Sequence, residues 1–220
     1  MKIFIDSANI RLIDSFMGMG IVDGVTTNPS LLAKENSDPT VQVKKILKLV
    51  PGHVSIEVVS TEYEKMVREA TAISRLGRNA VAKIPMTKDG MRAVRTLSNA
   101  GVKTNVTLIF SSAQAILAAK AGATYASPFI GRLDDIGTNG MELARDIISI
   151  YRNYSIKTKV LVASIRNPMH VIDAAKAGAD VVTLPPEILS LMFSHPLTDS
   201  GLKKFLSDWS GLAAKFKKWF

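Results

Sequence analysis

The sequence contains no cysteine and only three histidines. The lack of cysteine excludes a disulfide framework, thiol catalysis and cysteine-ligated metal. His53, His170 and His195 lie far apart, and none has ligand-type neighbours at the short spacings of a metal site. We therefore expect no metal ion, and nothing in the sequence indicates another cofactor.

Long apolar runs are also absent, although 47% of the residues are hydrophobic. No run approaches the ~20 apolar residues that a membrane-spanning helix requires. Met1 leads directly into a strand-like segment, without the basic region, apolar stretch and small-residue cleavage site of a secretory signal. We therefore expect a soluble, cytoplasmic protein without a membrane partner.

Acidic residues are outnumbered: 28 Lys and Arg against 19 Asp and Glu give a net charge of +9. This charge suits nucleic acid, an anionic surface or phosphorylated substrates. The basic residues are spread along the chain, with one dense cluster at its C-terminal end, and no zinc-finger spacing or aromatic-rich RNA-binding strand is present. We therefore expect phosphorylated small molecules, and not nucleic acid, as partners.

Strand-like segments alternate with helical patterns along the 220 residues. The strands are predicted at 2–6, 24–28, 54–59, 80–85, 103–109, 125–130, 159–164 and 181–185, and the helical patterns include 41–50, 62–76, 90–100, 111–121, 139–154 and 168–177. Such alternation predicts a parallel sheet, and eight units in this length predict a (β/α)8 TIM barrel. The rival, an open doubly wound sheet with a nucleotide loop, is not favoured because no G-x-G-x-x-G follows a strand. We expect one domain, with the barrel over residues 1–200 and a helical extension over 201–220.

An internal repeat supports the barrel. The six residues Ala-Ala-Lys-Ala-Gly-Ala occur at 118–123 and again at 174–179, and Asn99-Ala-Gly-Val102 is a weaker copy. In each copy the glycine is predicted to end a helix, and a strand begins a few residues later. The chain therefore reuses one helix-to-strand connection.

One lysine, Lys83, lies inside an apolar run. It follows Ala80-Val-Ala82 and precedes Ile84-Pro85, and turn residues flank the run on both sides. A buried ammonium group is costly unless it is paired, and it otherwise tends to become neutral. A neutral amine on a rigid strand can attack a ketone or aldehyde and form a Schiff base. Because most lysines are surface residues, Lys83 is the first candidate for catalysis.

Polar side chains also occur toward the C-terminal ends of the other predicted strands, where a (β/α)8 barrel has its catalytic groups. They are Asp6, Thr26, Asn28, Glu57, Asn105, Thr107, Ser127 and Ser164. Helix caps and turns explain some of them, such as Asn28 before Pro29. They do not explain two carboxylates together with a lysine.

Asp6, Glu57 and Lys83 suit carbonyl chemistry with divided roles. Lys83 would form an imine, one carboxylate would move a proton on a substrate hydroxyl during carbon–carbon cleavage, and the other would act through a water.

The remaining polar residues suit the binding of a phosphorylated polyol. Asn28, Asn105 and Ser127 could hold hydroxyl groups. Arg132 and Arg166, just past the sixth and seventh strands, are placed with Ser164 to bind a phosphate.

These residues lie in motifs that resemble the transaldolase family, in particular its short microbial branch, which also contains fructose-6-phosphate aldolase. The resemblance spans the whole chain and implies the barrel fold. Its motifs are Ile5-Asp-Ser-Ala8, Gly24-Val-Thr-Thr-Asn-Pro-Ser30, Lys83-Ile-Pro85, Asn105-Val-Thr107, Ser127-Pro-Phe-Ile-Gly-Arg132 and Ala163-Ser-Ile-Arg-Asn167.

The resemblance implies a role for each residue. Lys83 would be the Schiff-base lysine and Asp6 the acid/base on the cleaved bond. Glu57 and Thr107 would position the catalytic water. The dihydroxyacetone unit would be held by Asn28, Asn105 and Ser127, and the phosphate by Arg132, Ser164 and Arg166.

Three positions distinguish the two activities within this branch. The aldolases carry Gln at the place of Glu57 and Tyr at the place of Phe129, and they lack Asn at the place of Asn105. This chain has the transaldolase residue at all three. A tyrosine could hold a water or donate a proton that releases free dihydroxyacetone, and Phe129 cannot.

The resemblance therefore implies a class I transaldolase of the pentose phosphate pathway. It would move dihydroxyacetone from sedoheptulose 7-phosphate or fructose 6-phosphate to an aldose phosphate. Two alternatives stay open: a fructose-6-phosphate aldolase that releases free dihydroxyacetone, and a basic barrel that binds nucleic acid or a phosphorylated ligand without chemistry.

Apolar side chains recur at helical spacing near the C-terminal end, with lysines around them. They are Leu202, Phe205, Leu206, Trp209, Leu212, Ala213, Phe216 and Trp219. A basic amphipathic helix can lie on a membrane. Because so aromatic a surface is costly to leave exposed, we favour a subunit interface instead. The resemblance implies homo-oligomers, pentamers or decamers, in which neighbours exchange these helices.

Overall fold

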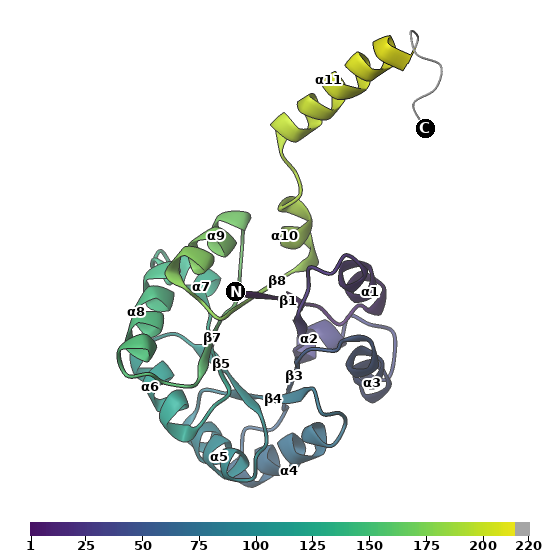
Figure 1. Ribbon diagram of the computed structural model, residues 1–220. Coiled ribbons are helices and arrows are strands. Elements are labelled where there is room, and N and C mark those ends of the chain that lie inside the picture. Colours follow the sequence, from purple (N-terminus) through teal and green to yellow (C-terminus); the bar gives the residue numbers. More distant parts are fainter. Residues whose placement is uncertain (214–220) are drawn as a thin grey trace.

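Eight parallel strands form a closed barrel in the computed structural model, which describes residues 1–213 (Figure 1). The strands are β1 (Lys2–Asp6), β2 (Gly24–Thr26), β3 (Val54–Glu57), β4 (Ala80–Pro85), β5 (Thr104–Ile109), β6 (Tyr125–Pro128), β7 (Lys159–Val162) and β8 (Val181–Leu184). Each strand pairs with its neighbours in sequence, and β8 closes the ring on β1. The predicted (β/α)8 barrel is confirmed.

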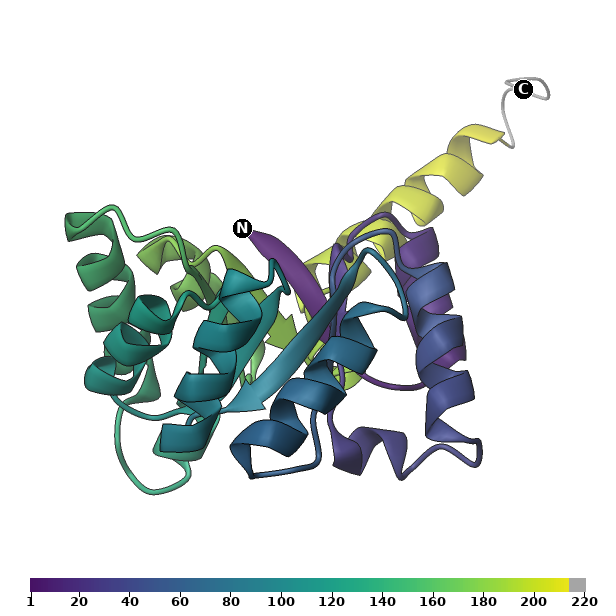
Figure 2. The same cartoon turned by 90° about the horizontal axis from the view of Figure 1, so that it is seen from below.

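Helices α1 to α9 surround the barrel and connect successive strands, and α10 and α11 follow the last strand (Figure 2). They are α1 (Ile10–Gly18), α2 (Pro29–Leu32), α3 (Pro39–Leu49), α4 (Tyr63–Ser74), α5 (Lys88–Asn99), α6 (Ser112–Ala121), α7 (Ile130–Asp134), α8 (Gly140–Asn153), α9 (Pro168–Ala177), α10 (Pro186–Leu191) and α11 (Pro196–Ala213). The sequence patterns did not include α1, α2, α7 and α10. The last three have at most six residues, too few to display a 3.6-residue period.

Several predicted strands extended too far at their C-terminal ends. The strand predicted at 24–28 ends at Thr26, because Asn28 already caps α2: its Oδ1 accepts a hydrogen bond from the Leu31 N–H at 2.9 Å. The strand predicted at 125–130 ends at Pro128, because α7 begins at Ile130.

The repeated connections have the predicted geometry. Gly122 and Gly178 end α6 and α9 in the left-handed conformation, with φ of 93° and 86°. In the weaker copy Gly101 follows α5 with φ of 73°. Residues with a side chain rarely adopt such positive φ angles, which explains why glycine recurs at the helix-to-strand connection.

Two apolar layers hold the fold together. The larger lies between the outer face of the sheet and the helices, and includes Ile5, Ile46 and Ile147. A smaller cluster fills the inside of the barrel. Alternate strand residues face opposite sides, so β1, β4, β6, β7 and β8 contribute to both layers.

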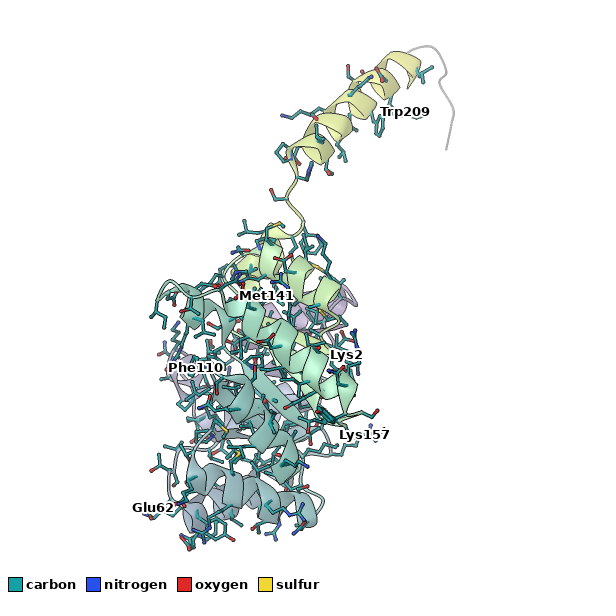
Figure 3. All side chains as sticks on the ribbon, turned by 90° about the vertical axis from the view of Figure 1, so that its left-hand side faces the viewer. Lys2, Glu62, Phe110, Met141, Lys157 and Trp209 are labelled. Carbon is teal, nitrogen blue, oxygen red and sulfur yellow. The ribbon has the colours of Figure 1, made fainter. Side chains whose placement is uncertain are left out.

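Helix α11 projects away from the barrel (Figures 1 and 2). Its Phe205 and Leu206 side chains are 71% and 63% exposed. The helix predicted over 201–220 coincides with α11 up to residue 213, while Phe216 and Trp219 lie outside the described residues. Figure 3 shows Trp209 on this helix, apart from the body of the molecule. Among residues 1–213, no helix is long and apolar enough to cross a bilayer.

Candidate active site

Strand register brings the predicted catalytic residues into neighbouring positions. Glu57 on β3 is the register partner of Lys83 on β4, and Lys83 is the partner of Asn105 on β5. Asp6 on β1 pairs in the same way with Thr26 on β2. Residues up to 99 positions apart in sequence therefore meet inside one end of the barrel.

The site rests on an apolar floor. The cluster inside the barrel consists of Phe4, Val81, Tyr125, Leu161, Ala163 and Val181, with Phe129 packed against it. Four members of this cluster, Phe4, Val81, Tyr125 and Val181, are each followed two residues later by a polar residue on the same face of the strand. These polar residues are Asp6, Lys83, Ser127 and Thr183. The polar layer therefore lies toward the C-terminal ends of the strands, and apolar side chains fill the barrel beneath it.

A pocket of about 190 Å³ opens over this polar layer. Nine of the predicted site residues line it: Asp6, Asn28, Lys83, Asn105, Ser127, Phe129, Arg132, Ser164 and Arg166. Glu57 and Thr107 are not part of its lining: Glu57 lies beside Lys83 on the neighbouring strand, and Thr107 follows Asn105 by two residues on β5. The barrel thus gathers residues from β1, β2 and β4 to β8, and from the loops that follow them, around one cavity.

Lys83 is buried and paired. Its side chain is 6% exposed, and its Nζ lies 2.9 Å from Glu57 Oε2. The same Nζ donates a hydrogen bond to the Thr27 carbonyl oxygen at 3.2 Å. Pairing with a carboxylate is the arrangement that a buried lysine requires, and here the carboxylate is also placed to accept its proton.

Asp6 is held in place by two threonines. The Thr26 hydroxyl donates to Asp6 Oδ1 at 2.7 Å, and the hydroxyls of Thr26 and Thr183 lie 2.6 Å apart. Burial raises the pKa of Asp6 above its ordinary value, while the charge of Lys83 and the hydrogen bond from Thr26 oppose this rise. A carboxyl group with a raised pKa is suited to both accepting and donating a proton near neutral pH.

Asn105 has a fixed orientation. Its Oδ1 accepts a hydrogen bond from the Ser127 hydroxyl at 2.7 Å, and its Nδ2 donates to Ser55 Oγ at 3.1 Å. The hydroxyl of Thr107 is buried and has no hydrogen-bond partner within the described residues. Such an unpaired buried hydroxyl is costly unless something else binds it.

Two arginines lie at the rim of the pocket. The Arg132 guanidinium lies 5.4 Å from the centre of the Phe129 ring. Arg166 donates from Nη2 to Asp135 Oδ2 at 2.7 Å, and this hydrogen bond holds the pKa of Asp135 below its ordinary value. Both arginines are exposed, so their remaining donors are open to a ligand.

Gly131 allows Arg166 to lie close to α7. A side chain at Gly131 would meet the Ser164 carbonyl oxygen at 2.0 Å and Arg166 Cγ at 2.7 Å. Ser164 itself has φ of 63°, a left-handed conformation that a serine adopts only under tertiary constraint. The loop after β7 and the start of α7 are therefore fitted closely to one another.

Three residues of the site were not predicted. Thr183 and Ser55 hydrogen-bond to the polar layer, and both are polar residues within apolar strands, the same signal that identified Lys83. Asp135 left no such signal. It lies just after the short helix α7, and its partner Arg166 is 31 residues away.

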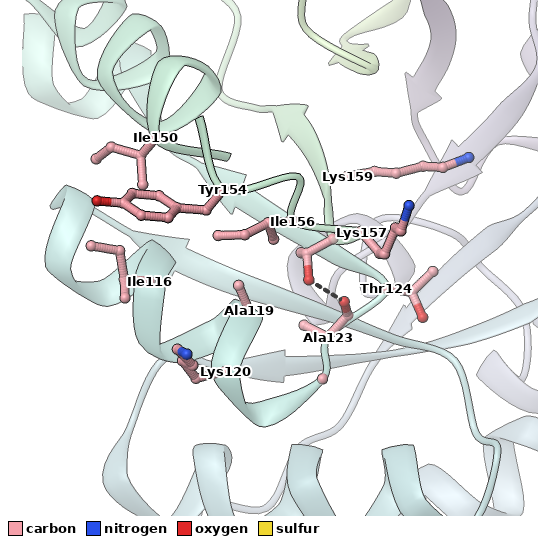
Figure 4. Close-up of a pocket in the computed structure, with 12 residues that line it drawn as sticks. Ile116, Ala119, Lys120, Ala123, Thr124, Ile150, Tyr154, Ile156, Lys157 and Lys159 are labelled. Atoms are coloured by element: carbon pink, nitrogen blue, oxygen red, sulfur yellow. Dashed lines mark hydrogen bonds between the residues drawn. The ribbon is translucent and has the colours of Figure 1, made fainter. Parts of the chain in front are cut away.

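A larger groove of about 900 Å³ lies at the opposite end of the barrel (Figure 4). Figure 4 shows Ile116, Ile150 and Tyr154 gathered on one side of it, with Lys157 and Lys159 on the other. None of the predicted site residues lines it. Figure 3 shows Lys157 and Lys2 at this end and Phe110 at the end that carries the predicted site.

Metal ligands do not gather anywhere in residues 1–213: no three His, Asp or Glu side chains come together there as a metal site requires. The groups that the pocket offers for chemistry are an amine, a carboxyl group, hydroxyl and amide groups, and two guanidinium groups.

Known proteins resemble this chain over nearly its whole length. A family model described as transaldolase/fructose-6-phosphate aldolase matches residues 3–217. A protein of Desulforapulum autotrophicum named "Probable transaldolase" is 56% identical over 209 residues, 95% of this chain and 97% of that protein. A protein of the same name from Thermodesulfovibrio yellowstonii is 56% identical over 212 residues, 96% of this chain and 99% of that protein. Another of that name, from Nitrosopumilus maritimus, is 55% identical over 216 residues, 98% of this chain and 97% of that protein.

Proposed function

The chain belongs to the transaldolase/fructose-6-phosphate aldolase family, and on this premise we propose that it is a class I transaldolase acting through a Schiff base on Lys83. Its donor would be sedoheptulose 7-phosphate or fructose 6-phosphate, and its acceptor an aldose phosphate. The observation that carries the proposal is the buried Lys83–Glu57 pair, 2.9 Å apart, in a pocket that also contains Asp6.

The first half of the reaction uses the lysine and both carboxylates. Glu57 accepts a proton from Lys83, and the free amine attacks the ketone carbon of the donor; loss of water then gives the iminium ion. Asp6 removes the proton of the C4 hydroxyl, the C3–C4 bond breaks, and the aldose product leaves. The bonding electrons remain on the three-carbon unit as an enamine attached to Lys83.

The second half reverses these steps on a new aldehyde. The enamine carbon attacks the acceptor carbonyl, and Asp6 returns its proton to the new hydroxyl. A water then adds to the iminium ion and releases the ketose product. We assign the positioning of this water to Glu57 and Thr107, and the unpaired, buried Thr107 hydroxyl supports that role.

Substrate binding divides between the two ends of the pocket. Ser127, Asn105 and Asn28 would hold the hydroxyls of the dihydroxyacetone unit. The Oδ1 of Asn28 is occupied in capping α2, so this residue would use its amide donor. Ser164 with Arg132 and Arg166 at the rim would bind the phosphate.

Transfer is favoured over release by the residue at the pocket wall. Phe129 lines the pocket and packs edge-on against Phe110, with ring centres 6.0 Å apart. A phenyl ring provides neither a proton nor a hydrogen bond to a water. The enamine would therefore persist until an aldehyde acceptor binds, whereas a fructose-6-phosphate aldolase releases free dihydroxyacetone.

Assembly into a homo-oligomer, a pentamer or a decamer, is part of the same proposal. The exposed apolar residues of α11 support it, because a helix that carries them would be covered in a stable protein. We place residues 201–220 at the interface between neighbouring subunits.

Borohydride trapping tests the central assignment. Incubation with fructose 6-phosphate and borohydride should attach the three-carbon or six-carbon unit to the peptide that contains Lys83. Lys83→Arg should abolish trapping and reduce turnover by at least about a thousandfold, because guanidinium forms no imine and several kcal/mol of barrier lowering are lost.

Lys103→Arg is the matched control, since Lys103 lies beside β5 and bonds the Arg78 carbonyl oxygen at 3.0 Å. It should keep full trapping. Trapping in Lys83→Arg would overturn the assignment. Free dihydroxyacetone formed at the rate of fructose 6-phosphate consumption, with no acceptor present, would favour the aldolase instead.

A further inference from the structure

Three side chains form a chain of hydrogen bonds across the first, second and last strands of the barrel. Asp6 on β1 accepts from Thr26 on β2, and the Thr26 hydroxyl lies 2.6 Å from that of Thr183 on β8. Thr26 and Thr183 are 2% and 4% exposed. At that burial, neither hydroxyl can exchange its partner for bulk water.

The number of hydroxyl protons fixes which group donates each hydrogen bond in this series. A threonine hydroxyl has one proton, and Thr26 uses it in the bond to the ionised Asp6. The bond between the two threonines must then be donated by Thr183. When Asp6 is protonated it can donate to Thr26, which in turn can donate to Thr183. Both states of Asp6 are therefore accommodated by rotating hydroxyl protons, without moving any heavy atom.

Opposing effects act on the ionisation of Asp6, so the hydrogen bonds through Thr26 and Thr183 can shift it. Lys83 on β4 favours the carboxylate, and Glu57 on β3 opposes it. Burial favours the protonated form most strongly of all. A hydrogen bond to a charged group is stronger than one to a neutral group, and each bond polarises the next, so the chain stabilises the carboxylate more than the acid.

We propose that Thr183 is a positioning residue for the acid/base step, acting on Asp6 through the Thr26 hydroxyl. The inference rests on the proposed function only for the catalytic role of Asp6. Thr183 lines the pocket, but within residues 1–213 its hydroxyl hydrogen-bonds to Thr26 and not to Lys83 or Asp6. Its hydroxyl sets the orientation in which Thr26 presents its proton to the carboxylate.

The test follows the Asp6 carboxyl group directly. In protein labelled with ¹³C at aspartate carboxyl carbons, the Asp6 signal is assigned by its absence in Asp6→Asn, and its titration is compared among variants. Thr183→Val, which removes the hydroxyl at nearly constant volume, should raise the Asp6 titration midpoint by roughly 0.3–0.7 pH units. Thr183→Ser, which restores a hydroxyl, should return it to within about 0.2 pH units of the wild-type value.

Two further variants keep the test decisive. A valine methyl close to the Thr26 oxygen could disturb folding, and Thr183→Ala removes the hydroxyl without that contact. Thr158→Val is the matched control: Thr158 is buried and bonds the Ala123 carbonyl oxygen far from the site, so its loss should not move the Asp6 signal.

Kinetics separate this inference from the proposed function. Thr183→Ala should lower kcat about tenfold and leave KM within about twofold of the wild-type value. The acidic limb of its kcat–pH profile should shift to higher pH by the same amount as the NMR midpoint. An unchanged midpoint in both the Val and Ala variants would overturn the role of Thr183. Full turnover in Asp6→Asn would instead overturn the catalytic role of Asp6, and the NMR comparison would still report on the hydrogen-bond chain.

Discussion

Asp6 is a residue of the site that lowers the stability of the folded protein when it is ionised. Its pKa is raised by burial above the unfolded value of 3.8, so the folded protein holds this proton more tightly than the unfolded chain does. Below pH 3.8 the group is neutral in both states and has no effect. As the pH rises from 3.8 through the folded pKa, the buried carboxylate destabilises the fold, and this effect is complete once the pH is above the folded pKa.

Asp6→Asn should therefore raise the melting temperature at pH 7 while abolishing turnover. Each kcal/mol of relief corresponds to roughly 2–4 °C in a chain of this length. The gain should shrink as the pH falls toward 4, where the wild-type side chain also becomes neutral. Calorimetry at both pH values, with the exposed Asp14→Asn as control, checks this; equal gains at pH 4 and pH 7 would contradict the explanation.

The rim arginines should matter only for phosphorylated substrates. Hydrogen bonds to charged groups contribute roughly 1.5–3 kcal/mol, which is about 10- to 150-fold in kcat/KM for Arg166→Ala or Arg132→Ala. The loss should appear mostly in KM if phosphate binds ground and transition states equally. Steady-state kinetics with fructose 6-phosphate and with fructose check this.

Arg145→Ala, an exposed arginine on α8, is the control and should have no effect. If the two rim variants lose as much activity on fructose as on fructose 6-phosphate, the arginines are structural partners of the loops. The Arg166–Asp135 pair makes that the specific alternative to exclude.

Sequence reasoning found residues whose type conflicts with their surroundings. Lys83 and Asp6 stand in apolar strands, and this conflict is visible without a structure. Thr183 is a weaker case, because a single threonine is common in strands. Asp135 could not be found, since only the folded loops bring it to Arg166.

The repeated helix-to-strand connection provides a matched pair of substitutions at the scale of the element. Gly122 and Gly178 have nearly the same φ, but their surroundings differ. A Cβ at Gly122 would lie 2.3 Å from Ser98 Oγ and 2.9 Å from Ser98 Cβ, whereas one at Gly178 would meet only the end of the flexible Arg152 side chain. The two sites therefore share the backbone penalty and differ in steric crowding.

Gly178→Ala should lower the free energy of unfolding by about 1 kcal/mol, the left-handed penalty less the entropy gained from a stiffer unfolded chain. Gly122→Ala should lower it by about 2–3 kcal/mol, because the Ser98 Cβ is fixed to α5 and cannot move aside. Urea unfolding measures both. Equal losses would mean that α5 and α6 separate easily.

Element boundaries were harder to predict than the elements themselves. The alternation of strands and helices follows from hydrophobic period, which survives in every repeat unit. The end of a strand depends on where the neighbouring strand stops and the next helix begins, as at Asn28, and such long-range features leave no local pattern.

At the scale of the whole molecule, α11 is the element that the barrel does not explain. Its apolar residues Leu202, Phe205 and Leu206 are more than half exposed. The amphipathic pattern predicted the helix, but its direction away from the barrel could not be predicted, because no local sequence signal sets it.

Replacing Leu202 and Phe205 together by Glu should dissociate the proposed oligomer into single chains, because charges would enter an apolar interface. Ser207→Glu, at an exposed position of the same helix, is the control and should leave the assembly intact. Sedimentation velocity over a range of concentrations measures both. An unchanged sedimentation coefficient for the double variant would exclude α11 from the interface.

The closure of the barrel limits how the folded protein can aggregate. All eight strands of the described chain have a partner on each side, so no row of free peptide groups is available to a strand from another molecule. Strand-to-strand aggregation therefore requires that a ladder of the ring open first. The rate of amyloid-like aggregation should accordingly follow the rate of unfolding, and rise only modestly with protein concentration while unfolding is the slow step.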